Sequence, residues 1–421
     1  MKKVKRSLFG DIAFILTENF YDRSAFISHK ILLMLRFFIL RMIVSKKKRV
    51  FFYYSKLFQR DRVRNPLFIL EGFDISLRVC ITYRCNSSCT FCYAKGLLKD
   101  FPMDMELGDF ISVVRWAKAH GKKYIMFLGG EPTIHPQFEE ILDFCHKEQI
   151  KTLLVTNGLY TERILEKLKS PSSSVAEIAF SYPQDQAVFP FKDKFLNNLS
   201  NLRKVKFNLL LSGVLDGNGE AWREIIQAAV KFRMPIRWSL LLPGRARDGN
   251  SCGALGDLNS VALQLLEVLR TCCDNRVICY VYRPVPACIF TPEQWKQIRK
   301  LFRHMVYTRC PIGLMKRYGS GVTVNPDLST YACISFFVKG PRITSFQDND
   351  SLNLYYEKSA KDVMSATSIE KCKNCQLYQN FLSSLTENKK HFFQKPLCDT
   401  TVCQGGCFAF RDTACSSLSS I

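Results

Sequence analysis

The sequence predicts an α/β fold: a partial (β/α)6 TIM-type barrel, preceded by a basic extension and followed by a small cysteine-rich domain. Between residues 75 and 244, short apolar runs alternate with helical stretches, which is the pattern of βαβ units around a parallel sheet. The 18 cysteines include clustered Cys-x-x-Cys and Cys-x-x-x-Cys groups, a spacing typical of metal ligands. With 47% hydrophobic and 23% charged residues, the composition excludes a disordered or fibrous protein.

The barrel elements follow one another in a regular order. Strands are expected at 75–83, 124–128, 151–156, 176–181, 204–211 and 236–242. The helices between them are expected at 104–119, 137–148, 161–168, 193–199 and 220–232. Six such units make a partial barrel, whose functional groups should lie at the carboxyl ends of the strands.

We divide the chain into four parts: a basic extension at 1–70, the barrel at 71–245, a connector at 246–308 and a cysteine-rich domain at 309–421. The connector is expected to hold a helix at 259–272, a strand at 277–282 and a helix at 292–306. The last part is loop-rich, with few long periodic segments. Bound metal would therefore supply much of its stability.

The N-terminal extension carries about half of the net charge of +23 within its first 65 residues. Its apolar stretch at 31–44 contains Arg36 and Arg41, so a transmembrane helix is not predicted there. A helix packed on the barrel, a helix on an anionic membrane surface, contact with nucleic acid and a dock for an acidic partner remain alternatives. No secretory signal opens the chain, and we expect a cytoplasmic protein whose cysteines bind metal.

The chemistry is indicated by Cys85, Cys89 and Cys92, which follow the first expected strand as Cys-x-x-x-Cys-x-x-Cys. Three thiolates can hold three irons of a [4Fe–4S] cube, which leaves the fourth iron open to a non-protein ligand. Cys80 lies within the strand and is expected to be a core thiol. The alternative, a structural zinc site, normally takes four protein ligands.

This motif, with Phe91 before its last cysteine, resembles the signature of the radical S-adenosylmethionine (SAM) superfamily. The resemblance implies that SAM binds the open iron and is cleaved reductively to a 5′-deoxyadenosyl radical, with an electron from a donor such as flavodoxin or ferredoxin. Later motifs follow in the family's order: a Gly-Gly-Glu string for the SAM ammonium group, an Asn-Gly string, a serine for the ribose and a backbone segment for the adenine. Each string is also compatible with a tight turn. The implied SAM contacts are Phe91, Tyr93, Gly129, Gly130, Glu131, Asn157, Ser181 and Leu242.

Residues 324–333 resemble the beginning of a SPASM domain, with Leu328 where that family has glycine. The resemblance implies one or two auxiliary [4Fe–4S] clusters, with Cys288 or Cys398 as further candidates and a zinc site as the alternative. A long insertion after residue 375 departs from the family spacing. The implied ligands are Cys310, Cys333, Cys372, Cys375, Cys403, Cys407 and Cys415.

SPASM-type enzymes mostly modify ribosomally made peptides. The resemblance therefore implies an oxidoreductase-like peptide maturase that abstracts hydrogen from a peptide or protein, leading to crosslinking, epimerisation or oxidation. An acidic leader could dock on the basic extension. The alternatives are a radical SAM enzyme acting on RNA or a small molecule, and a non-catalytic iron–sulfur adaptor. The sequence identifies no catalytic acid or base.

Overall fold

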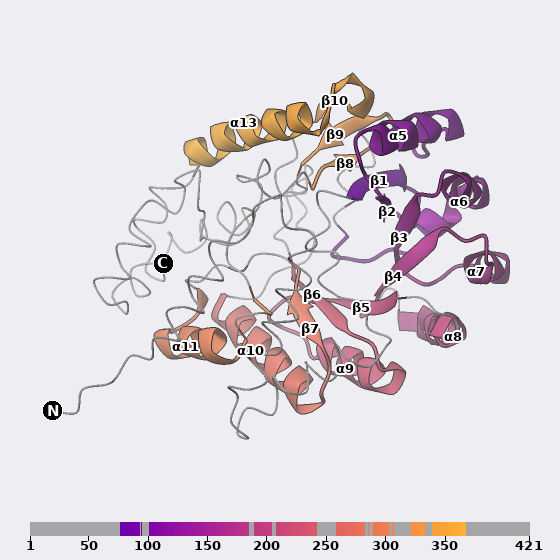
Figure 1. Ribbon diagram of the computed structural model, residues 1–421. Helices are drawn as coiled ribbons and strands as arrows, with labels where there is room; N and C mark the ends of the chain where they lie inside the picture. The colour runs from indigo at the N-terminus through magenta and orange to yellow at the C-terminus, as the bar shows by residue number, and fades with distance from the viewer. Residues whose placement is uncertain are drawn as a thin grey trace, which may run out of the picture. The chain divides into compact units, whose positions relative to one another are not determined.

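One sheet of ten strands organises the described part of the chain (Figure 1). The computed structural model describes residues 76–92, 94, 101–184, 189–203, 208–241, 258–282, 285, 289–302, 305–306, 321–332 and 339–367. The strand order is β10-β9-β8-β1-β2-β3-β4-β5-β6-β7. Neighbouring strands from β8 through β1 to β7 run parallel, whereas β9 and β10 are antiparallel. The strands are β1 (Ser76–Thr82), β2 (Tyr124–Gly129), β3 (Lys151–Thr156), β4 (Val175–Ser181), β5 (Asn208–Leu215), β6 (Ile236–Leu240), β7 (Cys279–Val281), β8 (Thr323–Val324), β9 (Ser329–Tyr331) and β10 (Gly340–Arg342).

Helices cover the outer face of the parallel strands (Figure 1). Phe110 of the first helix packs on Phe127 of β2, and Phe195 packs edge-on against Phe180 of β4. The inner face has its own apolar cluster, which includes Met126. Burial on both faces explains the near-continuous apolar strands. The helices are α5 (Leu107–Ala119), α6 (Phe138–Lys147), α7 (Glu162–Lys169), α8 (Lys192–Arg203), α9 (Ala221–Phe232), α10 (Leu258–Asp274), α11 (Pro292–Leu301) and α13 (Asn349–Thr367).

Helix boundaries follow local capping chemistry. The Thr161 hydroxyl accepts a hydrogen bond from the backbone N–H of Ile164 at the start of α7. Thr291 and Gln294 form a reciprocal capping box at the start of α11. Both caps satisfy backbone groups that the first helical turn leaves without partners.

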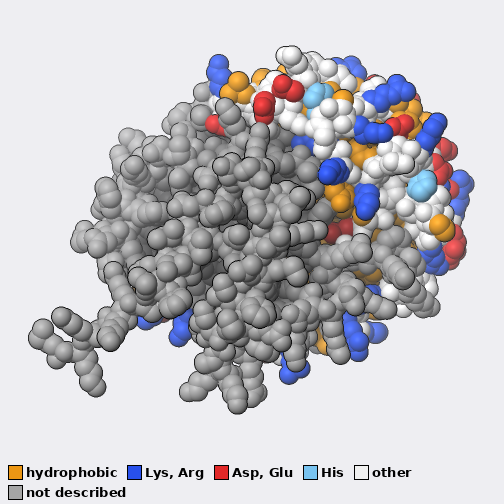
Figure 2. Space-filling view, viewed as in Figure 1, with side chains coloured by type: hydrophobic (Ala, Val, Ile, Leu, Met, Phe, Trp, Pro, Cys, Tyr) orange, Lys and Arg blue, Asp and Glu red, His pale blue; other side chains and the backbone are white. Residues whose placement is uncertain are grey.

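The outer surface carries charges of both signs. Figure 2 shows Lys and Arg side chains next to Asp and Glu on the visible described face. Lys118 and Glu148 form one such pair, with Nζ 2.6 Å from Oε2. No helix among the described residues is long and apolar enough to cross a membrane.

The partial barrel is confirmed: β1 to β6 are parallel, and five of them lie close to their predicted ranges. The fifth strand extends beyond its predicted end at residue 211, because β5 continues through Gly213 to Leu215. A Cβ at Gly213 would lie 2.4 Å from the Trp238 ring, so the glycine makes room for that ring within the sheet. The sheet is also larger than expected, since β7 extends one edge and the β8–β9 hairpin pairs beside β1. The 19-residue helix α13 was not predicted.

Candidate functional site

The three-cysteine loop begins at the carboxyl end of β1, where the barrel architecture places functional groups. Cys85 is exposed, while Cys89 and Cys92 are half-buried. Desolvation by the surrounding protein raises the pKa of Cys85 to about 11, and the charges of Glu131, Cys92 and Cys89 act in the same direction. The charges of Cys89 and Cys92 thus oppose ionisation of the Cys85 thiol, and a bound cationic centre would relieve that repulsion.

The cysteines do not converge on one point. In the described part of the chain, no group of three or more His, Cys, Asp or Glu side chains is placed to hold a single metal ion. A zinc ion requires its ligands around one centre. A [4Fe–4S] cube instead takes each thiolate on a separate iron.

Cys80 is the core thiol that its position within the strand predicts. It is fully buried on β1, and burial raises the pKa of its thiol to about 12. Cys80 packs with Tyr83, Ala94 and Phe101, and Cys92 lies against this cluster. This apolar cluster thus packs against the last cysteine of the loop.

The Gly-Gly-Glu string at the end of β2 lies directly beside the start of the cysteine loop. The Gly130 N–H donates to Thr82 O at 2.8 Å, and the Glu131 N–H donates to Arg84 O at 2.7 Å. A Cβ at Gly129 would lie 2.2 Å from Thr82 O, and one at Gly130 would lie 1.9 Å from Arg84 O. Only glycine allows the two backbones to approach so closely.

The Glu131 side chain joins two strand ends. It is 1% exposed, and burial raises the pKa of its carboxyl despite four hydrogen bonds. Oε1 accepts from Thr133 N, Thr133 Oγ1 and Thr156 Oγ1, and Oε2 accepts from Asn157 N at 2.7 Å. The carboxylate thus links the ends of β2 and β3. The expected contact of this carboxylate with a SAM ammonium group stays a prediction.

The Thr156-Asn157-Gly158 turn reaches the cysteine loop. Asn157 Nδ2 donates to Asn86 Oδ1 at 2.7 Å and lies 3.9 Å from Cys85 Sγ. Asn86 in turn donates to Leu159 O at 3.2 Å. The loop residue between the first two cysteines is therefore held by the end of β3. The sequence motifs gave no indication that Asn86 would make these contacts.

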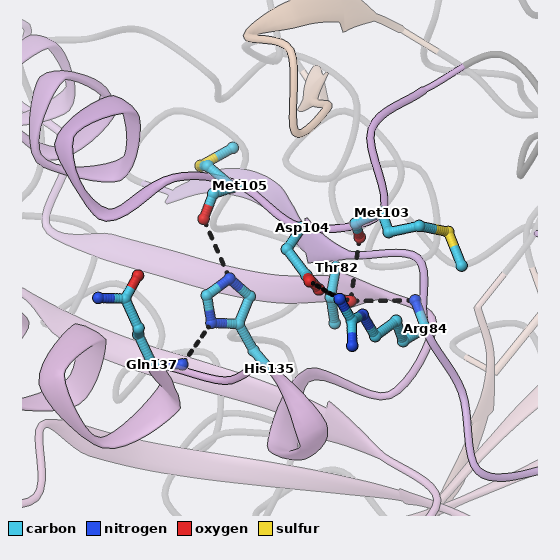
Figure 3. Close-up of polar contacts among 7 residues, drawn as sticks. All are labelled: Thr82, Arg84, Met103, Asp104, Met105, His135 and Gln137. Atoms are coloured by element: carbon cyan, nitrogen blue, oxygen red, sulfur yellow. Dashed lines mark hydrogen bonds and ion pairs between the residues drawn. The ribbon is translucent and has the colours of Figure 1, made fainter.

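The two ends of the cysteine loop meet at a neck, shown in Figure 3. The Thr82 hydroxyl donates to Asp104 Oδ1 at 2.7 Å, and Asp104 Oδ2 pairs with Arg84 Nη2 at 2.6 Å. The backbone of Met103 accepts from Tyr83 N at 2.7 Å, and Met105 N donates to Ile81 O at 2.8 Å. The chain therefore leaves β1 and returns beside it, which closes the loop between residues 85 and 102.

His135 anchors the same return segment from the side of β2. Its Nδ1 accepts from Gln137 N at 3.0 Å, so Nε2 carries the proton and donates to Met105 O at 3.0 Å. Burial lowers the pKa of His135, which favours this neutral form. Figure 3 shows the ring lying between these two backbone groups.

The remaining expected SAM contacts are only partly placed. Ser181 is exposed at the carboxyl end of β4, and Phe91 is half-buried in the cysteine loop. Tyr93 and Leu242 lie outside the described residues, as do residues 1–70 and all the expected auxiliary-cluster cysteines. The structure thus brings the Gly-Gly-Glu and Asn-Gly strings to the cysteine loop.

Residues 79–229 match the family model of the radical SAM superfamily. Over these residues, the chain is similar to the radical SAM superfamily. The matched residues run from β1 into α9.

Individual relatives cover different parts of the chain. A probable GTP 3′,8-cyclase of Methanococcus maripaludis is 33% identical over 95 residues, which is 22% of this chain and 32% of that protein. This chain thus spans about a third of the length of that curated relative.

Two solved structures share the fold over most of the chain. SuiB of Streptococcus suis, bound to precursor peptide SuiA, is 17% identical with a TM-score of 0.53, over 83% of this chain and 78% of SuiB. anSMEcpe with bound AdoMet is 17% identical with a TM-score of 0.52, over 80% of this chain and 90% of that one. At this identity, the likeness establishes the fold.

Proposed function

We propose that this chain is a radical SAM enzyme that binds a [4Fe–4S] cluster through Cys85, Cys89 and Cys92, cleaves SAM reductively and abstracts hydrogen from a peptide or protein. One observation carries the proposal: the ends of β1, β2 and β3 converge by hydrogen bonds on the three-cysteine loop. When bound, the cluster and SAM supply the electron and the 5′-deoxyadenosyl group for hydrogen abstraction.

The chain's own residues position this chemistry. The three thiolates would hold three irons, and the apolar cluster packed against Cys92 would limit the access of water to that ligand. Glu131 and Asn157 fix the two neighbouring turns against the loop. Gly130, Phe91 and Ser181 then offer backbone, aromatic and hydroxyl groups to SAM, with Tyr93, Gly129 and Leu242 as further contacts.

A peptide or protein substrate is favoured by the fold shared with SuiB, which was solved bound to its precursor peptide. The observed β8–β9 hairpin supports a SPASM-like C-terminal domain, because it spans most of residues 324–333. Leu328 there has φ +66, a conformation that favours the glycine of that family. We extend the proposal to one or two auxiliary clusters held by the C-terminal cysteines.

We further propose that the enzyme is cytoplasmic, with flavodoxin or ferredoxin as its electron donor. The four domains divide at residues 70, 245 and 308. The basic extension at 1–70 would dock an acidic leader, with a membrane surface or nucleic acid as the competing partners.

A small-molecule substrate is the second candidate, favoured by the sequence similarity to a probable GTP 3′,8-cyclase. That similarity covers 22% of the chain, in contrast to the 83% covered by the fold of SuiB. Incubation of the reduced enzyme with SAM and GTP tests the candidate. A GTP-derived product would favour it over a peptide substrate.

The experiment for the main proposal is anaerobic reconstitution followed by reduction in the presence of SAM. We expect 5′-deoxyadenosine from the wild-type chain and none from Cys85→Ala/Cys89→Ala/Cys92→Ala. The matched control is Cys145→Ala, which removes a buried thiol on α6 outside the site. Equal 5′-deoxyadenosine from wild type and the triple variant would overturn the proposal.

A further inference from the structure

The neck of the cysteine loop contains a carboxylate that no sequence motif indicates. Asp104 lies where the chain returns from the loop, and its two oxygens bind two different partners on the outgoing side. One partner is the hydroxyl of Thr82, which is fully buried, and the other is the guanidinium of Arg84, which directly precedes Cys85. A single side chain therefore ties both ends of the loop together (Figure 3).

The contacts on either side of Asp104 reinforce this closure. Met103 O accepts a hydrogen bond from Tyr83 N. Met105 N donates to Ile81 O, and Met105 O accepts from His135 Nε2. Three consecutive residues of the returning chain are thus bonded to the strand ends. The Arg84 N–H also donates to the Thr82 hydroxyl at 3.0 Å, so the hydroxyl bridges the side chain of Asp104 and the backbone next to Cys85.

The charge pair alone does not explain this arrangement. Arg84 is 51% exposed, and an exposed ion pair contributes little to stability in water. The second oxygen of Asp104, bound to a buried hydroxyl, makes the contact directional and fixes the separation of the two chain ends. The contact therefore lies at the neck of the loop, directly beside Cys85.

We propose that Asp104 is a positioning residue for the iron–sulfur cluster, because it closes the neck of the loop and orders Cys85, Cys89 and Cys92 before the cluster binds. This inference rests on the proposed function, since it assigns the same loop to the cluster. A preordered loop avoids the entropy cost of gathering three thiols at the moment of binding. Groups that orient the ligands of a metal site commonly change its affinity by 10- to 100-fold.

The test compares Asp104→Ala and Asp104→Asn with Glu148→Ala in the full chain. Asn keeps an acceptor for Thr82 but loses the ion pair, whereas Ala loses both contacts. Glu148 is the matched control, because its pair with Lys118 has the same 2.6 Å distance and a comparable exposure but lies on the helical surface. Peptide-resolved alkylation of the metal-free protein by a maleimide is the first measurement. The rate of cluster loss to an iron chelator is the second.

We expect Asp104→Ala to speed alkylation of Cys89 and Cys92 and to speed cluster loss by about 10-fold. Asp104→Asn should lie between Ala and wild type, and Glu148→Ala should match wild type. Cys273, half-buried on α10, should keep its wild-type alkylation rate. Unchanged rates in Asp104→Ala would overturn the inference, and so would a parallel rise at Cys273, because that marks general destabilisation.

The two possible failures remain distinguishable. If the wild-type chain takes up no iron and sulfide, the proposed function fails. If the wild type binds a cluster and the Asp104 variants retain it equally well, only the positioning role fails.

Discussion

Replacing Gly130 with alanine is the most informative single change at the site. The added Cβ would lie 1.9 Å from Arg84 O and 2.7 Å from Tyr83 O, and both atoms belong to backbone that cannot rotate away. The ends of β1 and β2 must therefore move apart. That movement breaks the bonds from Gly130 N to Thr82 O and from Glu131 N to Arg84 O.

The magnitude follows from these two effects. Overpacking a close contact costs about 1–3 kcal/mol, and each lost hydrogen bond costs about 0.5–1.5 kcal/mol. We therefore expect the free energy of unfolding to fall by about 2–6 kcal/mol, which is a large part of a typical domain's stability. Because Arg84 precedes Cys85, the same movement should reduce iron and sulfide binding.

Urea unfolding of the metal-free protein measures the first effect, and anaerobic iron and sulfide analysis measures the second. Gly108→Ala is the matched control, because a Cβ there meets no atom within 4 Å and the residue lies in helix α5. Alanine should leave stability unchanged or raise it by up to about 1 kcal/mol at that helical position. A wild-type urea midpoint for Gly130→Ala would refute the close-approach argument.

Three further changes test other parts of the account. Burial raises the pKa of the Glu177 carboxyl from 4.5 to about 7, so the protonated carboxyl contributes its full stability below pH 4.5. That contribution, about 3 kcal/mol, is lost as the pH rises through 7. Urea unfolding measured against pH should show this loss in the wild type and not in Glu177→Gln. Leu328 is 2% exposed and has φ +66. Leu328→Gly should lower the free energy of unfolding by about 1–4 kcal/mol, because the lost burial outweighs about 1 kcal/mol of relieved backbone strain. A higher melting temperature for this variant would contradict the prediction. The Tyr83 hydroxyl donates to the buried Asn325 Oδ1 at 2.7 Å, so Tyr83→Phe should lower the free energy of unfolding by about 1–3 kcal/mol. An unchanged melting temperature in thermal unfolding would show that this hydrogen bond does not stabilise the protein.

The barrel was predictable because its signals are local. β3 runs over Lys151–Thr156 as expected, since an apolar run there is followed at once by an Asn-Gly turn. β5 extends beyond its predicted end at residue 211, because Gly213 fits against the Trp238 ring within the sheet. A contact between strands decides that boundary, and one segment alone does not contain it.

The C-terminal half was harder to predict for the same reason. Helix α13 has a start signal, because Asp348 accepts from Ser351 N at 2.7 Å, but the apolar pattern along this helix is weak. The pairing of β8 with β1 joins residues far apart in the sequence. At the site, the cysteine and Gly-Gly-Glu motifs were visible in the sequence. The partners of Glu131 and the closure by Asp104 were not, because they depend on the folded positions of separate turns.

The central claim is that the loop at residues 85–92 holds an iron–sulfur cube with one iron open to SAM. Electron paramagnetic resonance of the reduced protein, recorded with and without SAM, tests it most directly. We expect a cluster signal that changes when SAM is added, and no such change in Cys85→Ala/Cys89→Ala/Cys92→Ala. A signal indifferent to SAM in the fully loaded wild-type chain, or the same SAM-dependent change in the triple variant, would contradict it.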